Sequence, residues 1–172
     1  MSTVFVGERP PEVDAWLQRR RELGQDLFDE VWEGSYHVAP APHRRHGDID
    51  DQVAFLLRPA ALAAGLHPTG PCNLGVRDDY RVPDRAYLRS DQPLTYEPTA
   101  ALVVEIHSPG DETYRKLDFY LACGVDELLV VDPQDRTVQW FARGDGAFVQ
   151  TGASELIEIT ADGLAADIDW PA

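Results

Sequence analysis

The sequence predicts an α/β domain in which helices flank a mixed central sheet and an antiparallel hairpin lies at the sheet edge. Two near-continuous apolar runs, AALVVEI at 100–106 and ELLVVD at 127–132, are typical of strands buried on both faces of a sheet. A helical segment separates them, so a right-handed crossover makes the two strands parallel. Two β-prone runs around RGDG at 143–146 predict the hairpin.

The first part of the chain predicts a helix followed by a strand pair. Apolar residues recur at near-helical spacing over 12–23, and Gly24 provides a stop. The segment FDEVWEGSYHV at 28–38 holds two short β-prone runs around Glu33 and Gly34. We expect this pair to add a second antiparallel edge to the central sheet.

The middle of the chain predicts a long helix and a less regular β region. Residues 46–64 place apolar side chains on one helical face, with a kink expected at Pro59 and a stop at Gly65. The segment 66–88 is rich in Gly, Pro and Asp and contains the β-like pieces CNLGV and YRVPDRAYL. Its strand boundaries are therefore the least well defined.

The helix between the two buried strands has its own start and stop signals. Asp111 is the expected N-cap, and Gly124 ends the helix. An apolar stripe along the helix consists of Leu117, Tyr120 and Leu121. This stripe predicts that the helix packs on the sheet with Tyr120 in the core.

Length and cysteine content predict one cytoplasmic domain. The 172 residues fit a single core, with residues 1–10 expected to be flexible. Cys72 and Cys123 lie far apart, which predicts reduced thiols. The sequence has no signal-like start and no apolar run long enough to span a membrane, so no membrane partner is expected.

The net charge of −15 at pH 7 argues against a broad nucleic-acid-binding surface. Proteins that bind duplex DNA usually carry a basic footprint that neutralises phosphates. The cations of this chain do cluster, however, and a local positive groove stays open as an interpretation. The clusters are RRR at 19–21, HRRH at 43–46, and Arg77, Arg81, Arg85 and Arg89.

Two carboxylates lie where a ligand site is expected. Glu105 is near the C-terminal end of the first buried strand, where ligands bind in open α/β sheets and where an unpaired charge would be costly. Asp84 begins a β-prone segment and converges on Glu105 if the two strands are neighbours. Such a pair suits Mg²⁺, which takes one or two carboxylates together with water and phosphate oxygens.

Lys116 is the only lysine of the chain and follows these acids on the next helix. Its stem is expected to run along apolar surface beside Leu117, so that the ammonium reaches the strand end. A compact point charge there would neutralise the acids, orient a water and stabilise a charged transition state. A general bias toward arginine explains the lone lysine equally well.

The segments VPDRAYL and LVVEIHSPGDETYRKLDFYLACGVDELLVVDP resemble the Uma-type putative restriction endonuclease family, a branch of the PD-(D/E)xK nuclease superfamily. The segment DEVWEGSYHVAPAPHRRHGDI is similar to that family's N-terminal signature. The resemblance implies a restriction-endonuclease-like fold. It also implies endonuclease activity, which is hydrolysis of nucleic-acid phosphodiester bonds with Mg²⁺ or Mn²⁺ as cofactor.

The same resemblance implies roles for individual residues. Asp84 would be the acid of the PD motif and Glu105 the acid of the (D/E)xK motif. The lysine of that motif would have moved to the following helix as Lys116. Glu33 would join the metal site from the N-terminal hairpin. These four residues form the expected site.

Two histidines are accessory candidates. His107 stands where the superfamily usually has lysine, either as a harmless variant or as an added ligand favouring transition metals such as Mn²⁺ or Zn²⁺. His46 matches a histidine at the start of the long helix. A zinc site formed by His37, His43 and His46 is a weaker interpretation, because no cysteine pair supports it.

Structural and functional alternatives stay open at this point. Glu105 and Lys116 could form a purely structural ion pair, whereas Asp84 and Glu33 could be ordinary turn residues. The main hypothesis is a nuclease with DNA as its partner. One alternative is a non-catalytic interaction or regulatory module, with a homo-oligomer expected in either case. Another is a metal-dependent phosphohydrolase acting on small nucleotides, which avoids binding a long polyanion.

Overall fold

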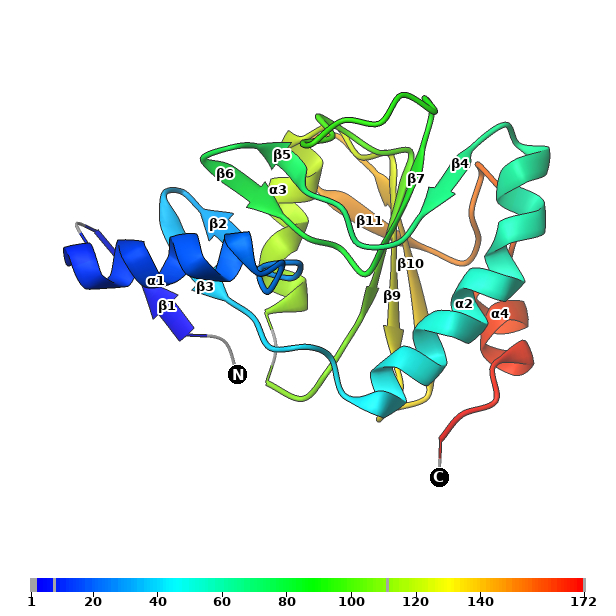
Figure 1. The fold of residues 1–172 in the computed structure, drawn as a ribbon. Helices are drawn as coiled ribbons and strands as arrows, with labels where there is room; N and C mark the ends of the chain where they lie inside the picture. Colours follow the sequence, from blue (N-terminus) through cyan, green and yellow to red (C-terminus); the bar gives the residue numbers. More distant parts are fainter. Residues whose placement is uncertain (1–2, 8, 111, 172) are drawn as a thin grey trace.

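The centre of the fold is a six-stranded sheet with the strand order β11-β10-β9-β8-β7-β4 (Figure 1). The computed structural model describes residues 3–7, 9–110 and 112–171, so the N-cap expected at Asp111 lies outside the described residues. The strands are β4 (His67–Thr69), β7 (Arg85–Leu88), β8 (Leu102–Ile106), β9 (Glu127–Asp132), β10 (Thr137–Arg143) and β11 (Phe148–Thr151). Strands β8 and β9 are parallel and the other neighbours antiparallel, with the hairpin β10–β11 at the edge, as the sequence predicts.

Helices cover both faces of this sheet (Figure 1). Helices α2 (Arg44–Ala63) and α4 (Ala161–Asp167) pack on one face, where apolar side chains of β8 and β9 meet them. On the other face lies α3 (Leu117–Ala122), preceded by the 3₁₀ turn η1 (Thr113–Lys116). Because side chains alternate along a strand, Val103 and Glu105 of β8 point toward α3. This alternation aims the buried carboxylate at the following helix.

The N-terminal hairpin belongs to a second sheet, which corrects the expectation that it extends the central one. The order of this sheet is β1-β3-β2-β6-β5. Its strands are β1 (Thr3–Phe5), β2 (Glu30–Trp32), β3 (Ser35–Val38), β5 (Leu74–Val76) and β6 (Asp79–Arg81). Strand β2 pairs with β6, opposing Val31 to Tyr80, because these strands share an apolar cluster with helix α1 (Pro11–Glu22). The segment 66–88 is therefore divided between the two sheets.

Other details refine the expected elements. Within the first ten residues, for which the sequence predicts flexibility, Thr3–Phe5 pair with β3. Helix α2 begins before His46, because His43 serves as its N-cap by accepting a hydrogen bond from the Arg45 amide, and it continues through Pro59. Cys72 and Cys123 are free thiols. No helix in the described part of the chain is long and apolar enough to cross a membrane.

Candidate functional site

A cleft of about 650 Å³ is lined by both sheets, by the start of α2 and by η1. Its lining is apolar in part, and the rest of the lining includes a group of ionisable side chains. These are Glu30, His37, His43, His46, Asp84, Glu105, Glu112 and Lys116. The cleft thus gathers residues that lie far apart in the sequence.

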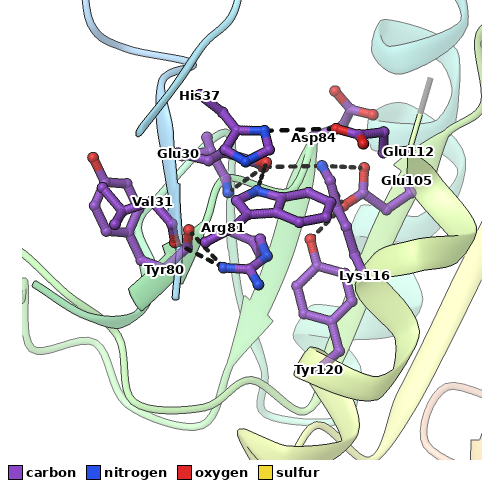
Figure 2. A network of polar contacts seen from close by, with 12 residues as sticks. Glu30, Val31, His37, Tyr80, Arg81, Asp84, Glu105, Glu112, Lys116 and Tyr120 are labelled. Carbon is purple, nitrogen blue, oxygen red and sulfur yellow. Dashed lines mark hydrogen bonds and ion pairs between the residues drawn. The ribbon is translucent and has the colours of Figure 1, made fainter. Parts of the chain in front are cut away.

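Glu105 is a deeply buried acid of this cleft, with only 3% of its surface exposed. The Lys116 ammonium donates to both of its carboxylate oxygens, at 3.2 Å to Oε1 and 3.4 Å to Oε2. The Tyr120 hydroxyl also donates to Oε1 (Figure 2). Lys116 therefore reaches Glu105 as expected, although it ends a 3₁₀ turn and does not lie in the second turn of α3.

A second acid, Glu30, holds Lys116 from the opposite side (Figure 2). The Lys116 Nζ lies 2.9 Å from Glu30 Oε1, which also accepts a 2.8 Å hydrogen bond from the Val82 amide. Glu30 Oε2 accepts a 2.7 Å hydrogen bond from the Trp32 indole. Glu30 is thus fixed by three donors, and the ammonium is held between two carboxylates.

Asp84 is tied to the backbone next to Glu105. It precedes β7, which pairs with β8 and places Arg85 opposite Val104. Asp84 Oδ2 accepts a 2.7 Å hydrogen bond from the Ile106 amide, while Oδ1 lies 2.8 Å from His46 Nε2. The antiparallel pairing therefore brings the two predicted acids to one end of the sheet. His46 of α2 joins them through its contact with Asp84.

Burial sets the protonation of this group. Burial raises the pKa of Glu105 to about 8; Lys116 opposes the shift, and the negative charges of Asp84 and Glu30 add to it. Burial would lower the pKa of Lys116, but Glu105 and Glu30 outweigh it and raise that pKa. Lys116 consequently stays a cation. Burial alone would lower the pKa of His46, but the hydrogen bond to Asp84 and the negative charges of Asp84, Asp50 and Glu105 together outweigh it and raise that pKa.

The structure does not bring Glu33 into this cleft. Glu33 occupies the tight turn between β2 and β3, with a positive φ of 48°, and its side chain is exposed. Its amide donates to Asp79 at 3.1 Å. The strand residue Glu30 lines the cleft instead and contacts Lys116. A metal-binding role of Glu33 stays a prediction.

His107 also lies outside the cleft. In a continuing strand, residue 107 would point to the same side of the sheet as Glu105. Strand β8 ends at Ile106, so this alternation does not extend to His107. The His107 Nδ1 lies 2.9 Å from Asp132 Oδ2 at the end of β9. The expected accessory role of His107 at the acids therefore has no support in its position.

The other histidines do not form a zinc site, because each of them contacts a different neighbour. His43 caps α2, His46 contacts Asp84, and His37 stacks on Trp32 with ring centroids 4.6 Å apart. Within the described residues, no three His, Cys, Asp or Glu side chains form a group that could hold a metal ion. The three histidines serve different neighbours and do not share a ligand.

The oxygen donors of the cleft nevertheless fit an octahedral cation that keeps water. Mg²⁺ is usually bound by one or two carboxylates, with waters and substrate phosphate completing its shell. Asp84 and Glu105 supply that number, and the charges of Asp84 and Glu30 already act unfavourably on an ionised Glu105. A divalent cation would offset this repulsion, so the residues present fit such an ion.

The arginines of 81–89 do not form a positive groove. The guanidinium of Arg81 lies over Trp32 and Phe119 at 4.3 and 4.0 Å from their ring centroids, and it pairs with Asp79. Arg85 lies 2.6 Å from Asp50, and Arg89 lies 2.5 Å from Asp126. Each charge is offset within the protein, so these arginines do not supply a basic footprint.

The two glutamates of the N-terminal hairpin should differ in their effect on stability. We expect Glu30→Gln to lower the free energy of unfolding by about 2 kcal/mol, because it removes a charged partner of buried Lys116. Glu33→Gln should change it by less than about 0.5 kcal/mol, because the side chain is exposed. Urea unfolding monitored by fluorescence measures the free energy of unfolding of both variants. Equal losses would contradict the conclusion that Glu30, and not Glu33, is the buried partner of Lys116.

Sequence reasoning missed Glu30 and Tyr120 as members of the site. For Glu30 a signal existed, since a Glu-Gly pair favours a turn and leaves the preceding glutamate in the strand. For Tyr120 the apolar stripe correctly predicted burial but carried no information on the partner of its hydroxyl. Both residues contact the predicted pair Glu105–Lys116.

Comparisons with known proteins show the family of the chain and, independently, its fold. A model of the Uma2 family, described as "Putative restriction endonuclease", matches residues 13–168. Among solved structures, a "putative nuclease belonging to DUF820" from Anabaena variabilis is similar, with a TM-score of 0.66 and 14% identity over 81% of this chain and 90% of that chain. The fold is therefore restriction-endonuclease-like. A search of curated proteins gave no match.

Proposed function

The chain belongs to the Uma2 family, and from this membership we propose that it is a divalent-metal-dependent nuclease that hydrolyses phosphodiester bonds of nucleic acid. The observation that carries the proposal is the placement of Lys116 between two carboxylates in a cleft that also holds Asp84. Carboxylates can hold a divalent cation that activates water, and a lysine can stabilise the charge that develops on the phosphate, so hydrolysis can proceed without a covalent intermediate.

Asp84 and Glu105 would hold Mg²⁺ or Mn²⁺. When bound, such an ion supplies Lewis-acid activation of the phosphate and lowers the pKa of a coordinated water. The protein's contribution is to fix the two acids. Asp84 is held by the Ile106 amide and His46, and Glu105 by Tyr120 and Lys116. We assign His46 the accessory role of orienting Asp84.

Lys116 would orient the attacking water and stabilise the negative charge that develops on the phosphate oxygens. Its raised pKa keeps the ammonium charged at neutral pH. Glu30 would keep that ammonium in the cleft if Glu105 bound a metal ion, because the position of Glu30 is fixed by Val82 and Trp32. Preorganised charge of this kind stabilises a transition state without reorganisation.

The substrate is the part of the proposal with a serious alternative. DNA is the first candidate because of the family. A small nucleotide is favoured by the net charge of −15 and by the internal pairing of Arg81, Arg85 and Arg89. A short substrate avoids the repulsion that a long polyanion would meet. The homo-oligomer expected from the sequence stays a prediction.

Cleavage assays with matched variants test the activity. With Mn²⁺ present, we expect hydrolysis of single-stranded DNA, duplex DNA or a nucleoside triphosphate. Asp84→Asn should lower the rate about 100-fold, because an amide oxygen is a weaker metal ligand and about 3 kcal/mol of transition-state stabilisation is lost. Asp145→Asn, in the exposed β10–β11 turn, is the matched control and should keep full activity. Activity that survives both Asp84→Asn and a chelator would contradict a metal-dependent nuclease activity at this site.

A further inference from the structure

The hydroxyl of Tyr120 lies at the proposed metal site although its ring lies in the core. The side chain is fully buried, among the apolar residues that join α3 to the central sheet. Four residues earlier stands Lys116, which places both side chains on one face of the η1–α3 segment. The same helix face therefore presents two donors to Glu105 (Figure 2).

The two donors act unequally on the Glu105 carboxylate. Oε1 accepts from the Tyr120 hydroxyl and, at 3.2 Å, from Lys116. Oε2 is reached by Lys116 at the longer distance of 3.4 Å, the single hydrogen bond to it among the described residues. Oε1 thus accepts two hydrogen bonds, whereas Oε2 accepts one long hydrogen bond from Lys116.

Tyr120 is suited to hold this oxygen permanently. Its ring is fully buried in the apolar cluster between α3 and the sheet, which fixes the position of the hydroxyl next to Oε1. The hydroxyl carries no charge of its own, so unlike Lys116 it is not drawn away by Glu30.

We propose that Tyr120 is a positioning residue of the metal site: its hydroxyl holds Glu105 Oε1 so that Oε2 faces an incoming cation. The inference rests on the proposed function, because it assigns Glu105 as a ligand. It adds a member to the site that neither the spacing of the acids nor the resemblance indicates. Partners that orient a metal ligand contribute to affinity without touching the ion.

The test is calorimetric titration of Mn²⁺ into the substrate-free protein. Tyr120→Phe keeps the buried ring and removes only the hydroxyl. We expect the Kd for Mn²⁺ to rise about 10-fold, within the range for loss of a ligand's hydrogen-bond partner. The matched control is Tyr87→Phe, which alters an equally buried tyrosine under α2 and should leave the Kd unchanged. Circular dichroism checks that both variants are folded.

A kinetic measurement separates positioning from a general loss of structure. In Tyr120→Phe, the Mn²⁺ concentration for half-maximal cleavage should rise by the same factor as the Kd. The rate at saturating Mn²⁺ should stay within about twofold of wild type, because the other groups are intact. A folded Tyr120→Phe with the wild-type Kd overturns this inference alone. A wild type that binds no Mn²⁺ overturns the proposed function, and this inference with it.

Discussion

Lys116→Met should lower the free energy of unfolding by about 3–5 kcal/mol at pH 9, the cost of leaving buried charges without a partner. The ammonium lies 2.9 Å from Glu30 and 3.2 Å from Glu105, and all three side chains are largely buried. Methionine fills similar volume without charge. Glu30 and Glu105 would then lose the cation between them, and Glu105 would hold its proton to a higher pH.

The loss of free energy of unfolding caused by Lys116→Met should shrink as the pH falls. A carboxyl whose pKa is raised in the folded state binds protons more readily there than in the unfolded chain. The free energy of unfolding therefore falls as the pH rises from the pKa of the unfolded chain toward the pKa of the folded protein. Glu105 already has its pKa raised to about 8 with the lysine present, and losing the lysine raises it further. Below about pH 8 Glu105 holds its proton in both folded proteins, so the difference develops above that pH, and urea unfolding at pH 7 and pH 9 measures it.

Two further variants control for this result. Lys116→Met combined with Glu105→Gln removes both members of the pair and should recover much of the lost stability. Arg44→Met removes a cation that is 89% exposed and should cost less than about 0.5 kcal/mol. A pH-independent loss below about 1 kcal/mol in Lys116→Met would mean that the ammonium does not shield the two acids.

Glu105→Gln should abolish Mn²⁺ binding and lower the cleavage rate by about 10³-fold, equivalent to about 4 kcal/mol of transition-state stabilisation. The amide keeps the shape of the side chain and can still accept from Tyr120, and Lys116 keeps Glu30 as its partner. The variant should therefore stay folded. Calorimetry with Mn²⁺ and the cleavage assay measure the two losses on the same preparation.

A second buried glutamate provides the matched control for that variant. Glu127, also 3% exposed, starts β9 and accepts hydrogen bonds from Trp140, Ser154 and the Glu155 amide. It anchors the chain after β11 and lies outside the cleft. Glu127→Gln should lose stability but keep the Mn²⁺ affinity. Equal loss of Mn²⁺ binding in both variants would mean that burial in general, and not Glu105, governs the effect.

The parts of the fold with strong local signals could be predicted from the sequence. Strands β8 and β9 are buried on both faces and therefore appear as unbroken apolar runs. A charge inside such a run needs a partner, which is why the pairing of Glu105 with Lys116 could be inferred from residue types and spacing. The membership of β2, β3 and β6 in a second sheet depends on long-range pairing, and short strands carry little information about their partners.

The features of the candidate site that the sequence did not indicate have the same origin. Glu30 and Glu33 are three residues apart, and only the turn geometry decides that Glu30 and not Glu33 lines the cleft. Tyr120 satisfies an apolar pattern with its ring while its hydroxyl contacts Glu105. His107 stands two residues after Glu105, but the strand ends between them. A pattern of residue types records burial and spacing, not the direction of a polar atom.

The hydrogen bond from the Ile106 amide to Asp84 gives the site a natural spectroscopic reporter. At this point a side-chain carboxylate replaces the main-chain carbonyl that would continue the β7–β8 ladder. A cation drawing electron density from Asp84 would weaken this bond. The amide proton of Ile106 would then move upfield and exchange faster with solvent. A single backbone resonance would thus register occupancy of the cleft, even with a diamagnetic ion such as Mg²⁺ and with no substrate turned over.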